Sequence, residues 1–162
     1  MGARVDFCHT PKQYEASRED LPLEQVLVFA AHTVLAEVHE DGFVPLFWNP
    51  VGILVPEAIE GLVLLGMPQT AAVLNEAAFR LGAPYPRDRN ERRDALLARS
   101  GGAESLADRI FRTDEDPFVA LRRALGSQEL DRLALRLLNL SEAENGGFPL
   151  AAGRFLESLG LG

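Results

Sequence analysis

The feature of this sequence that most restricts its fold is a helical repeat of apolar residues in positions 24–38. From Glu24 onward, apolar side chains recur at intervals of three and four residues: Leu27, Ala30, Ala31, Val34, Leu35 and Val38. Side chains at this spacing share one face of an α-helix, which completes a turn about every 3.6 residues. The repeat therefore predicts a helix over residues 22–41 with one buried face.

Prolines and glycines divide much of the remaining chain into further helices. Proline suits the first turn of a helix, where a backbone N–H has no partner, and glycine suits the position after the last turn. This pattern predicts helices over residues 56–66, 68–82, 117–126 and 149–160, and apolar periodicity adds helices near 89–99, near 104–112 and from Ser127 onward. No segment alternates as a strand does. We therefore predict an all-α fold, a single compact domain over residues 1–162 with about seven to eight short helices.

An apolar, proline-containing segment follows the 22–41 helix. Residues 43–55 carry Pro45 and Pro50, which argue against a central strand, so we predict an ordered, buried loop. If Gly42 is left-handed, Phe43 packs back on Val38 as in a Schellman helix stop. Trp48, the only tryptophan, is expected to cover the core or, alternatively, to anchor a partner.

Negative charge is concentrated in the first half of the chain. The net charge is −8; residues 1–79 contain 11 acids and three bases, whereas residues 80–162 contain 13 of each. This distribution disfavours direct binding to nucleic acid and favours a basic protein surface as the partner. The alternative is that the acids only maintain solubility. The mixed arginines and acids of residues 87–99 predict a solvated helix face or, alternatively, one that folds back on the acidic half.

Three acids lie near the C-terminal end of the predicted 22–41 helix, where negative charge is unfavourable. Glu37, Glu40 and Asp41 lie at the C-terminal end of the 22–41 helix, where the helix dipole is negative. Acids in this position indicate either internal partners or a surface offered to another molecule. An internal partner is expected to be an arginine of residues 87–99 or the backbone of the turn at 47–52.

The same region carries a spaced motif. Glu37-Val38 and Gly42-Phe43 are followed by Phe47, Asn49 and Gly52. The pattern resembles the hallmark of the bacterial DNA-mimic-protein domain family, E-V-x-N-G-G-F followed by phenylalanine, asparagine and glycine. The resemblance covers roughly residues 20–125, which leaves residues 126–160 as a C-terminal helical extension.

The resemblance implies an all-helical, acidic, cytoplasmic protein without known catalytic residues. The founding member of the family is described as imitating the charge of DNA and occupying the DNA-binding face of a transcription regulator. Where the family has Asn-Gly-Gly, this chain has Glu40-Asp41-Gly42, so it loses the asparagine and gains two carboxylates. The unaltered sequence Asn-Gly-Gly-Phe occurs at residues 145–148, which predicts a repeated way of ending a helix or, alternatively, a fragment of a duplication.

The function favoured by the sequence is that of a non-enzymatic acidic protein-binding module, in one version a DNA mimic on the basic face of a DNA-binding protein. The predicted partner-binding residues are Glu37, Glu40, Asp41, Trp48, Asn49, Glu57 and Glu60. The alternatives are an immunity protein that neutralises a basic toxin, an enzyme using carboxylates of the 37–49 region, and a homo-oligomeric structural protein such as a homodimer.

No catalytic residue, cofactor or metal site is predicted. His32 and His39 are about 10 Å apart along a helix, which is too far for one ion. The sequence contains no phosphate-binding loop and no nucleophile elbow. A single cysteine, Cys8, and the lack of an apolar run of about 20 residues favour a cytoplasmic protein outside the membrane.

Overall fold

Helices make up every regular element that the structure describes. The computed structural model describes residues 10–100, Val119, Arg123, Leu125 and 128–160. The α-helices are α1 (Pro11–Arg18), α2 (Leu23–Asp41), α3 (Phe43–Trp48), α4 (Val55–Leu64), α5 (Pro68–Phe79), α6 (Arg89–Arg99), α9 (Gln128–Ala143) and α10 (Phe148–Ser158), with 3-10 helices η1 (Pro50–Leu54) and η2 (Glu144–Gly146). These residues contain no strand, and the predicted all-α class is confirmed.

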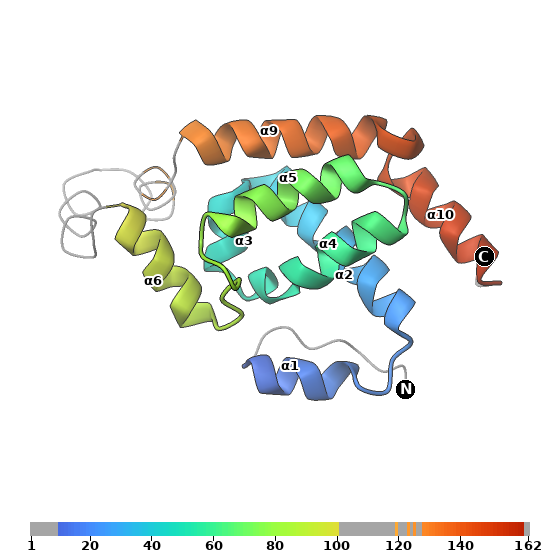
Figure 1. Ribbon diagram of the computed structural model, residues 1–162, viewed down its shortest axis with the longest axis horizontal. Helices are drawn as coiled ribbons and strands as arrows, with labels where there is room; N and C mark the ends of the chain where they lie inside the picture. Colours follow the sequence, from blue (N-terminus) through green and yellow to red (C-terminus); the bar gives the residue numbers. More distant parts are fainter. Residues whose placement is uncertain (1–9, 101–118, 120–122, 124, 126–127, 161–162) are drawn as a thin grey trace.

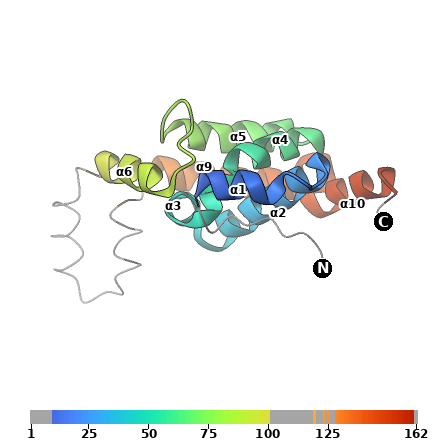
Figure 2. The same ribbon diagram turned by 90° about the horizontal axis from the view of Figure 1, so that it is seen from below.

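The helices are arranged around a central pair, α2 and α4 (Figure 1). Helix α5 packs beside α4, and α9 runs along α5 and contacts α2 and α3. Helix α1 lies outside the central pair on the side opposite α9, and Figure 2 shows it across the near face of the body. Helix α10 extends from the end of α9 and carries the C-terminus. The prolines at the starts of α4, α5 and α10 lie in their first turns, as predicted.

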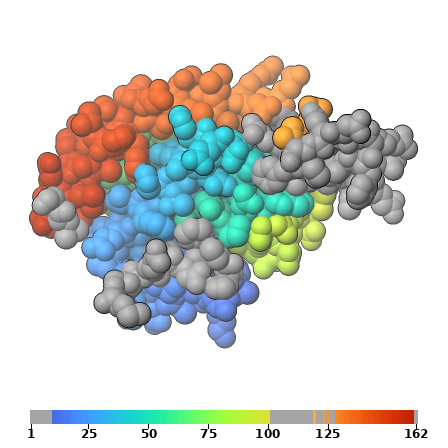
Figure 3. Space-filling view, turned by 180° about the vertical axis from the view of Figure 1, so that it is seen from behind, coloured from blue at the N-terminus to red at the C-terminus, as the bar shows by residue number. Residues whose placement is uncertain are grey.

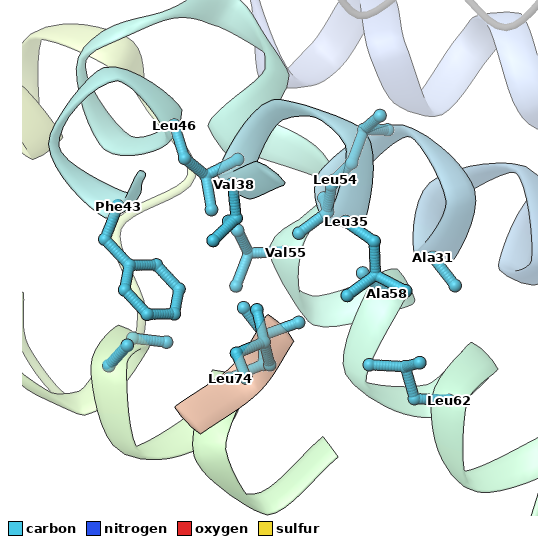
Figure 4. Packing of buried hydrophobic residues seen from close by; sticks show 14 of the residues in the cluster. Ala31, Leu35, Val38, Phe43, Leu46, Leu54, Val55, Ala58, Leu62 and Leu74 are labelled. Atoms are coloured by element: carbon cyan, nitrogen blue, oxygen red, sulfur yellow. The ribbon is translucent and has the colours of Figure 1, made fainter. Parts of the chain in front are cut away.

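The core lies between the apolar faces of α2, α4 and α5 (Figure 4). All six apolar residues of the predicted face of α2 are buried: Leu27, Ala30, Ala31, Val34, Leu35 and Val38. The predicted 22–41 helix and its buried face are therefore confirmed. A Cβ atom built on Gly61 would lie only 2.3 Å from the carbonyl oxygen of Leu27. Glycine at this position in α4 allows its backbone to approach α2 closely.

Most predicted helices appear near their expected positions. The predictions for residues 56–66, 68–82, 89–99, the segment after Ser127 and 149–160 correspond to α4, α5, α6, α9 and α10. The helices predicted near 104–112 and over 117–126 lie outside the described residues, except for Val119, Arg123 and Leu125, which are helical. Helix α1 was not predicted, although Thr10 and Gln13 form a capping box ahead of Pro11.

The prediction of a loop over residues 43–55 is wrong. This segment forms α3 and η1 and enters α4 at Val55. Its prolines do not oppose helices because Pro45 is the third residue of α3 and Pro50 is the first residue of η1. A proline in the first turn gives up an N–H that has no partner there. The buried part of the prediction holds, because Phe43 to Phe47 are all buried.

The predicted Schellman stop at Gly42 is also wrong in its geometry. Gly42 has φ 85° and ψ −171°, which is positive in φ but outside the left-handed helical region. Its N–H donates to the carbonyl of Val38 at 2.9 Å, and Phe43 then begins α3 directly. Gly42 therefore joins two helices at a corner rather than folding a loop back over α2.

Candidate protein-binding site

The two polar residues of the sequence motif bind each other at the corner between α2 and α3. The side-chain amide of Asn49 donates to Glu37 Oε1 at 3.0 Å, and both residues are partly buried. Of the alternatives for Glu37, the structure shows the internal partner, although it is a side-chain amide and not a backbone N–H or an arginine. Glu37 and Asn49 therefore hold α2 to the end of α3.

A buried arginine completes this corner. Arg92 of α6 is 1% exposed, and its Nε and Nη2 donate to the carbonyls of Phe47 and Asn49, each at 3.0 Å, while Nη1 donates to the carbonyl of Arg87. The negative end of the α3 dipole favours a cation at this place. Burial lowers the pKa of Arg92 from its usual value, whereas the carbonyl dipoles that accept from its guanidinium favour the charged form.

The remaining motif residues also support this arrangement. A Cβ atom on Gly52 would lie 2.6 Å from Arg92 Nε and 2.6 Å from the carbonyl oxygen of Leu46, so glycine leaves the room that the guanidinium occupies. The rings of Phe43 and Phe47 stack with centroids 5.6 Å apart. The motif at 37–52 thus stabilises the corner between α2 and α3, and its spacing reflects the packing of that corner.

Trp48 is held by two further arginines of α6. Arg89 Nε and Arg93 Nε donate to the carbonyl of Trp48 at 3.1 and 3.2 Å, and the guanidinium of Arg93 lies 4.7 Å from the centre of the indole ring. The indole is partly buried against the core. The predicted solvated face of residues 87–99 is therefore wrong for these arginines, because they bind the end of α3.

Glu57 must be removed from the predicted partner-binding residues. It is 3% exposed, and its Oε1 accepts from Arg18 at 3.0 Å and from Arg87 at 2.8 Å, while its Oε2 accepts from Arg87 at 3.0 Å. The carboxylate faces inward because Arg18 of α1 and Arg87 before α6 converge on it. This ion cluster fulfils the alternative in which the arginine segment folds back on the acidic half.

Glu40, Asp41 and Glu60 remain from the predicted set. Glu40 and Glu60 are exposed and make no hydrogen bond or ion pair with the rest of the described chain. Asp41 is partly buried. Glu60 lies on α4 next to Gly61, which packs on Leu27, whereas Glu40 lies at the opposite end of α2. The structure therefore does not bring Glu60 together with Glu40 and Asp41.

A groove between the end of α2 and α9 contains the clearest acidic site. It has a volume of about 250 Å³. Its polar lining consists of the carboxylates Glu40, Asp41 and Asp131 together with His39, and its remaining lining consists of Val38, Gly42, Phe43, Val44, Ala134, Leu135 and Leu138. Figure 3 shows this part of α2 beside α9. Asp131 is exposed and was not predicted. We name these residues the acidic groove.

Comparison with known proteins identifies the family. A family model described as DMP19-like protein matches residues 19–145. The chain belongs to the DMP19-like protein family. No curated protein and no solved structure matches it. The DMP19-like match confirms the family resemblance found in the sequence, but it extends to residue 145 instead of 125. Helix α9, which carries half of the acidic groove, therefore belongs to the DMP19-like region and not to an extension.

The second Asn-Gly-Gly-Phe closes the DMP19-like region by a corner similar to the first. Gly147 has φ 89° and ψ 156°, close to the conformation of Gly42, and Phe148 begins α10 as Phe43 begins α3. Asn145, with φ 53°, donates from its side chain to the carbonyl of Leu65 at 2.7 Å. The repeated way of ending a helix is thus present at both places, and here it also fixes α9 to the turn between α4 and α5.

Glu144 adds a charged cap to the same contact. Its carboxylate accepts from the backbone N–H of Gln69 and Thr70 and from Thr70 Oγ1, at 2.9, 2.8 and 2.7 Å. Burial opposes ionisation, but these three hydrogen bonds outweigh it and lower the pKa of Glu144 from its usual value of 4.5. The carboxylate also lies at the positive end of the α5 dipole.

The Glu144 cap makes stability depend on pH in a defined direction. Because the folded-state pKa is lowered, the ionised cap stabilises the fold fully above pH 4.5 and less as pH falls through the folded pKa. We expect Glu144→Ala to lower the free energy of unfolding by about 1 kcal/mol at pH 7, with the difference from wild type shrinking below pH 4.5. Urea unfolding at pH 7 and pH 3.5 measures this. The matched control is Glu142→Ala, which replaces an exposed acid in the last turn of α9, and an equal loss in that variant would contradict the cap.

The described residues meet neither the requirements of a metal site of three or more ligands nor those of a membrane-spanning helix. They contain no group of three or more His, Cys, Asp and Glu side chains arranged to hold a metal ion. His32 stacks on Phe148 with ring centroids 6.0 Å apart, so it contacts the start of α10. Cys8 lies outside the described residues. No described helix has both the length and the apolar character that crossing a bilayer requires.

Proposed function

We propose that this DMP19-like protein is a non-enzymatic binding protein whose acidic groove docks on a basic protein surface, in particular the DNA-binding face of another protein. The observation that carries the proposal is the groove itself, where carboxylates of α2 and α9 border an apolar floor on a chain of net charge −8. Membership of the DMP19-like family supports the DNA-mimic version.

The groove has the chemistry that a lysine or arginine side chain requires. These side chains have an aliphatic stem and a charged tip, so the stem packs on apolar surface while the tip contacts a carboxylate. Phe43 and Leu138 provide apolar surface, and Glu40 and Asp131 provide carboxylates from two different helices. Acids that served only solubility would not need an apolar floor between them. Complementary charge of this kind also speeds association and orients the partner.

Exposed acids lie near both ends of α2. Glu24 and Glu40 are both exposed at opposite ends of this helix. At a rise of about 1.5 Å per residue they are about 24 Å apart, which is a large part of one turn of B-DNA at about 34 Å. Glu19 and Asp20 add exposed carboxylates before α2. The 16-residue separation, at about 100° of rotation per residue, turns the side chains of Glu24 and Glu40 to nearly opposite sides of α2, so these two acids do not form one row of charge.

The alternatives differ in how the structure supports them. An immunity protein against a basic toxin would use the same groove, and only the partner separates it from a DNA mimic. An enzyme using carboxylates of residues 37–49 would have to use Glu40 and Asp41, which line the acidic groove, because Glu37 is hydrogen bonded to Asn49 and lies outside the groove.

Displacement from immobilised DNA tests the proposal. DNA-binding proteins of the native host are retained on DNA-cellulose and then eluted with the purified chain at low salt. We expect the wild-type chain to release at least one protein, with release falling as salt rises because the contact is electrostatic. Neutralising the groove with Glu40→Gln and Asp131→Asn is expected to weaken this release by at least about tenfold.

The matched control removes the same charge elsewhere. Glu142→Gln with Glu157→Gln neutralises two exposed acids outside the groove and should release the same protein as wild type. Two results would oppose the proposal: no protein released by the wild-type chain, or equal release by the groove variant and the wild type. Release of a toxin in place of a DNA-binding protein would support the immunity alternative.

A further inference from the structure

A second groove of opposite charge lies on the other side of Leu135. It has a volume of about 550 Å³ and lies between the start of α5 and the outer face of α9. Its lining consists of Gln69, Arg132, Leu135, Arg136, Asn139, Leu140 and Ala143. We name it the basic groove. It shares Leu135 with the acidic groove but contains none of the acids that carry the proposed function.

The apolar part of the basic groove includes Leu135, whose side chain is mostly exposed. Leu135 is 62% exposed and points away from the face of α9 that buries Leu130, Leu133 and Leu137 in the core. It is therefore not needed for packing α9 on the body. Single exposed apolar side chains are common on protein surfaces, so the case for a contact surface rests on Leu135 lying in one groove with Leu140 and two arginines.

The two arginines of the groove are available to a partner. Arg132 is exposed and makes no hydrogen bond or ion pair with the described residues. The side chain of Arg136 is 64% exposed, and its Nη1 forms an ion pair with Glu76 Oε2 at 3.8 Å. By contrast, Arg87 binds the Glu57 carboxylate and Arg92 binds three carbonyls. The arginines of the basic groove thus differ from those that hold the fold together.

We propose that the basic groove binds an acidic amphipathic helix of a partner protein. Arg132 and Arg136 are four residues apart on α9, or about 6 Å along its axis, so they match two carboxylates one turn apart on a partner helix. Between these carboxylates, an apolar side chain of the partner packs on Leu135 and Leu140. Gln69 and Asn139 supply amides at the rim.

Charge and shape together favour this occupant over nucleic acid. Duplex DNA would place a row of phosphates along α9, where Asp131 precedes Arg132 and is exposed. The net charge of −8 repels every anionic partner, but it repels duplex DNA, with one charge per about 1.7 Å, far more than a helix that carries two carboxylates. An acidic helix needs only two carboxylates, one turn apart, to pair with Arg132 and Arg136. Its leucine or phenylalanine covers the apolar surface of the groove, whereas a phosphate backbone would leave that surface exposed to water. The groove therefore fits a short peptide segment.

A designed peptide tests the inference directly. The probe is a fluorescein-labelled helical peptide of about 14 residues with glutamates four residues apart and leucine between them, titrated with the full chain by fluorescence anisotropy. We expect saturable binding that weakens at least tenfold in Arg132→Glu, because the variant places a carboxylate opposite a carboxylate. Leu135→Gln is expected to weaken binding about fivefold through loss of apolar contact.

Controls separate groove binding from general charge effects. Lys12→Glu makes the same change in net charge on exposed α1 and should bind the probe like wild type. A probe with lysine in place of glutamate should not bind the basic groove. The inference is overturned if the probe fails to saturate, if Arg132→Glu and Lys12→Glu bind alike, or if amide shifts caused by the probe map away from α9.

A second copy of this chain is the alternative occupant of the basic groove. Analytical ultracentrifugation tests it by measuring whether the chain forms a dimer. If the wild-type chain forms a dimer that Arg132→Glu dissociates and that the probe disrupts, the groove is filled by a second copy and the partner-helix inference is wrong. If the chain stays monomeric at the concentrations of the titration, the binding site for the probe is free. Loss of displacement from DNA-cellulose, in contrast, leaves this inference unaffected.

Discussion

Replacing Arg92 with alanine is expected to lower the free energy of unfolding by about 3 kcal/mol. The variant leaves the carbonyls of Phe47, Asn49 and Arg87 without their donor and opens a cavity below α6. The opposing effect is relief from burying a cation, which is visible in the lowered pKa of Arg92. The loss of one buried and two part-buried hydrogen bonds outweighs it, since a buried unsatisfied acceptor costs about 1–3 kcal/mol. Urea unfolding at pH 7 measures the change.

Two companion variants show which effect dominates. Arg92→Met keeps much of the volume but removes the donors, so it should remain destabilised by at least about 2 kcal/mol. Arg89→Ala removes a single hydrogen bond to the carbonyl of Trp48, which Arg93 also contacts, and should cost less than about 1 kcal/mol. A stable Arg92→Met would show that the cavity and not the hydrogen bonds matters.

Replacing Glu57 with glutamine is the second large expected effect. Glutamine leaves Arg18 and Arg87 facing each other without the carboxylate that both contact. Breaking a fully buried ion pair costs about 3–5 kcal/mol. Because the two arginine side chains are 25% and 31% exposed and can turn toward water, we expect a smaller loss of about 2 kcal/mol. Thermal and urea unfolding both measure it.

Glu60 provides the matched control on the same helix. Glu60→Gln removes an exposed charge three residues from Glu57 and should change the free energy of unfolding by less than about 0.5 kcal/mol. The pair of variants also tests the correction to the binding site. If Glu57→Gln left stability unchanged but weakened displacement from DNA-cellulose, Glu57 would act on the surface after all.

The helices were predictable because local signals agree with the packing. The apolar repeat of α2, the proline at the start of α5 and the glycine after α2 each predict the element that forms. Two signals were misread. Pro45 and Pro50 argue against a central strand and led to the prediction of a loop, although each fits the first turn of a helix. The sequence of Thr10 and Gln13 around Pro11 is that of a capping box, which predicts the start of α1.

The site was only partly predictable because exposure depends on tertiary partners. Glu57 and Glu60 have the same chemistry and lie on one helix, but arginines distant in sequence reach only the first. Asp131 joins the acidic groove from α9, more than 80 residues beyond Glu40, and no local pattern connects them. Leu135 lies off the buried face of α9, but a single exposed leucine does not distinguish a contact surface from the rest of the protein surface.

The interlocking of Glu37, Asn49 and Arg92 has a consequence for how the family diversifies. These residues contact one another inside the corner, so selection for folding can retain them whatever the protein binds. Residues 40 and 131 project from the outside of that corner and can change without disturbing it. We therefore expect homologues with the same corner to share the fold but to bind unrelated partners. The side chains on the outside of the corner determine which partner each homologue binds.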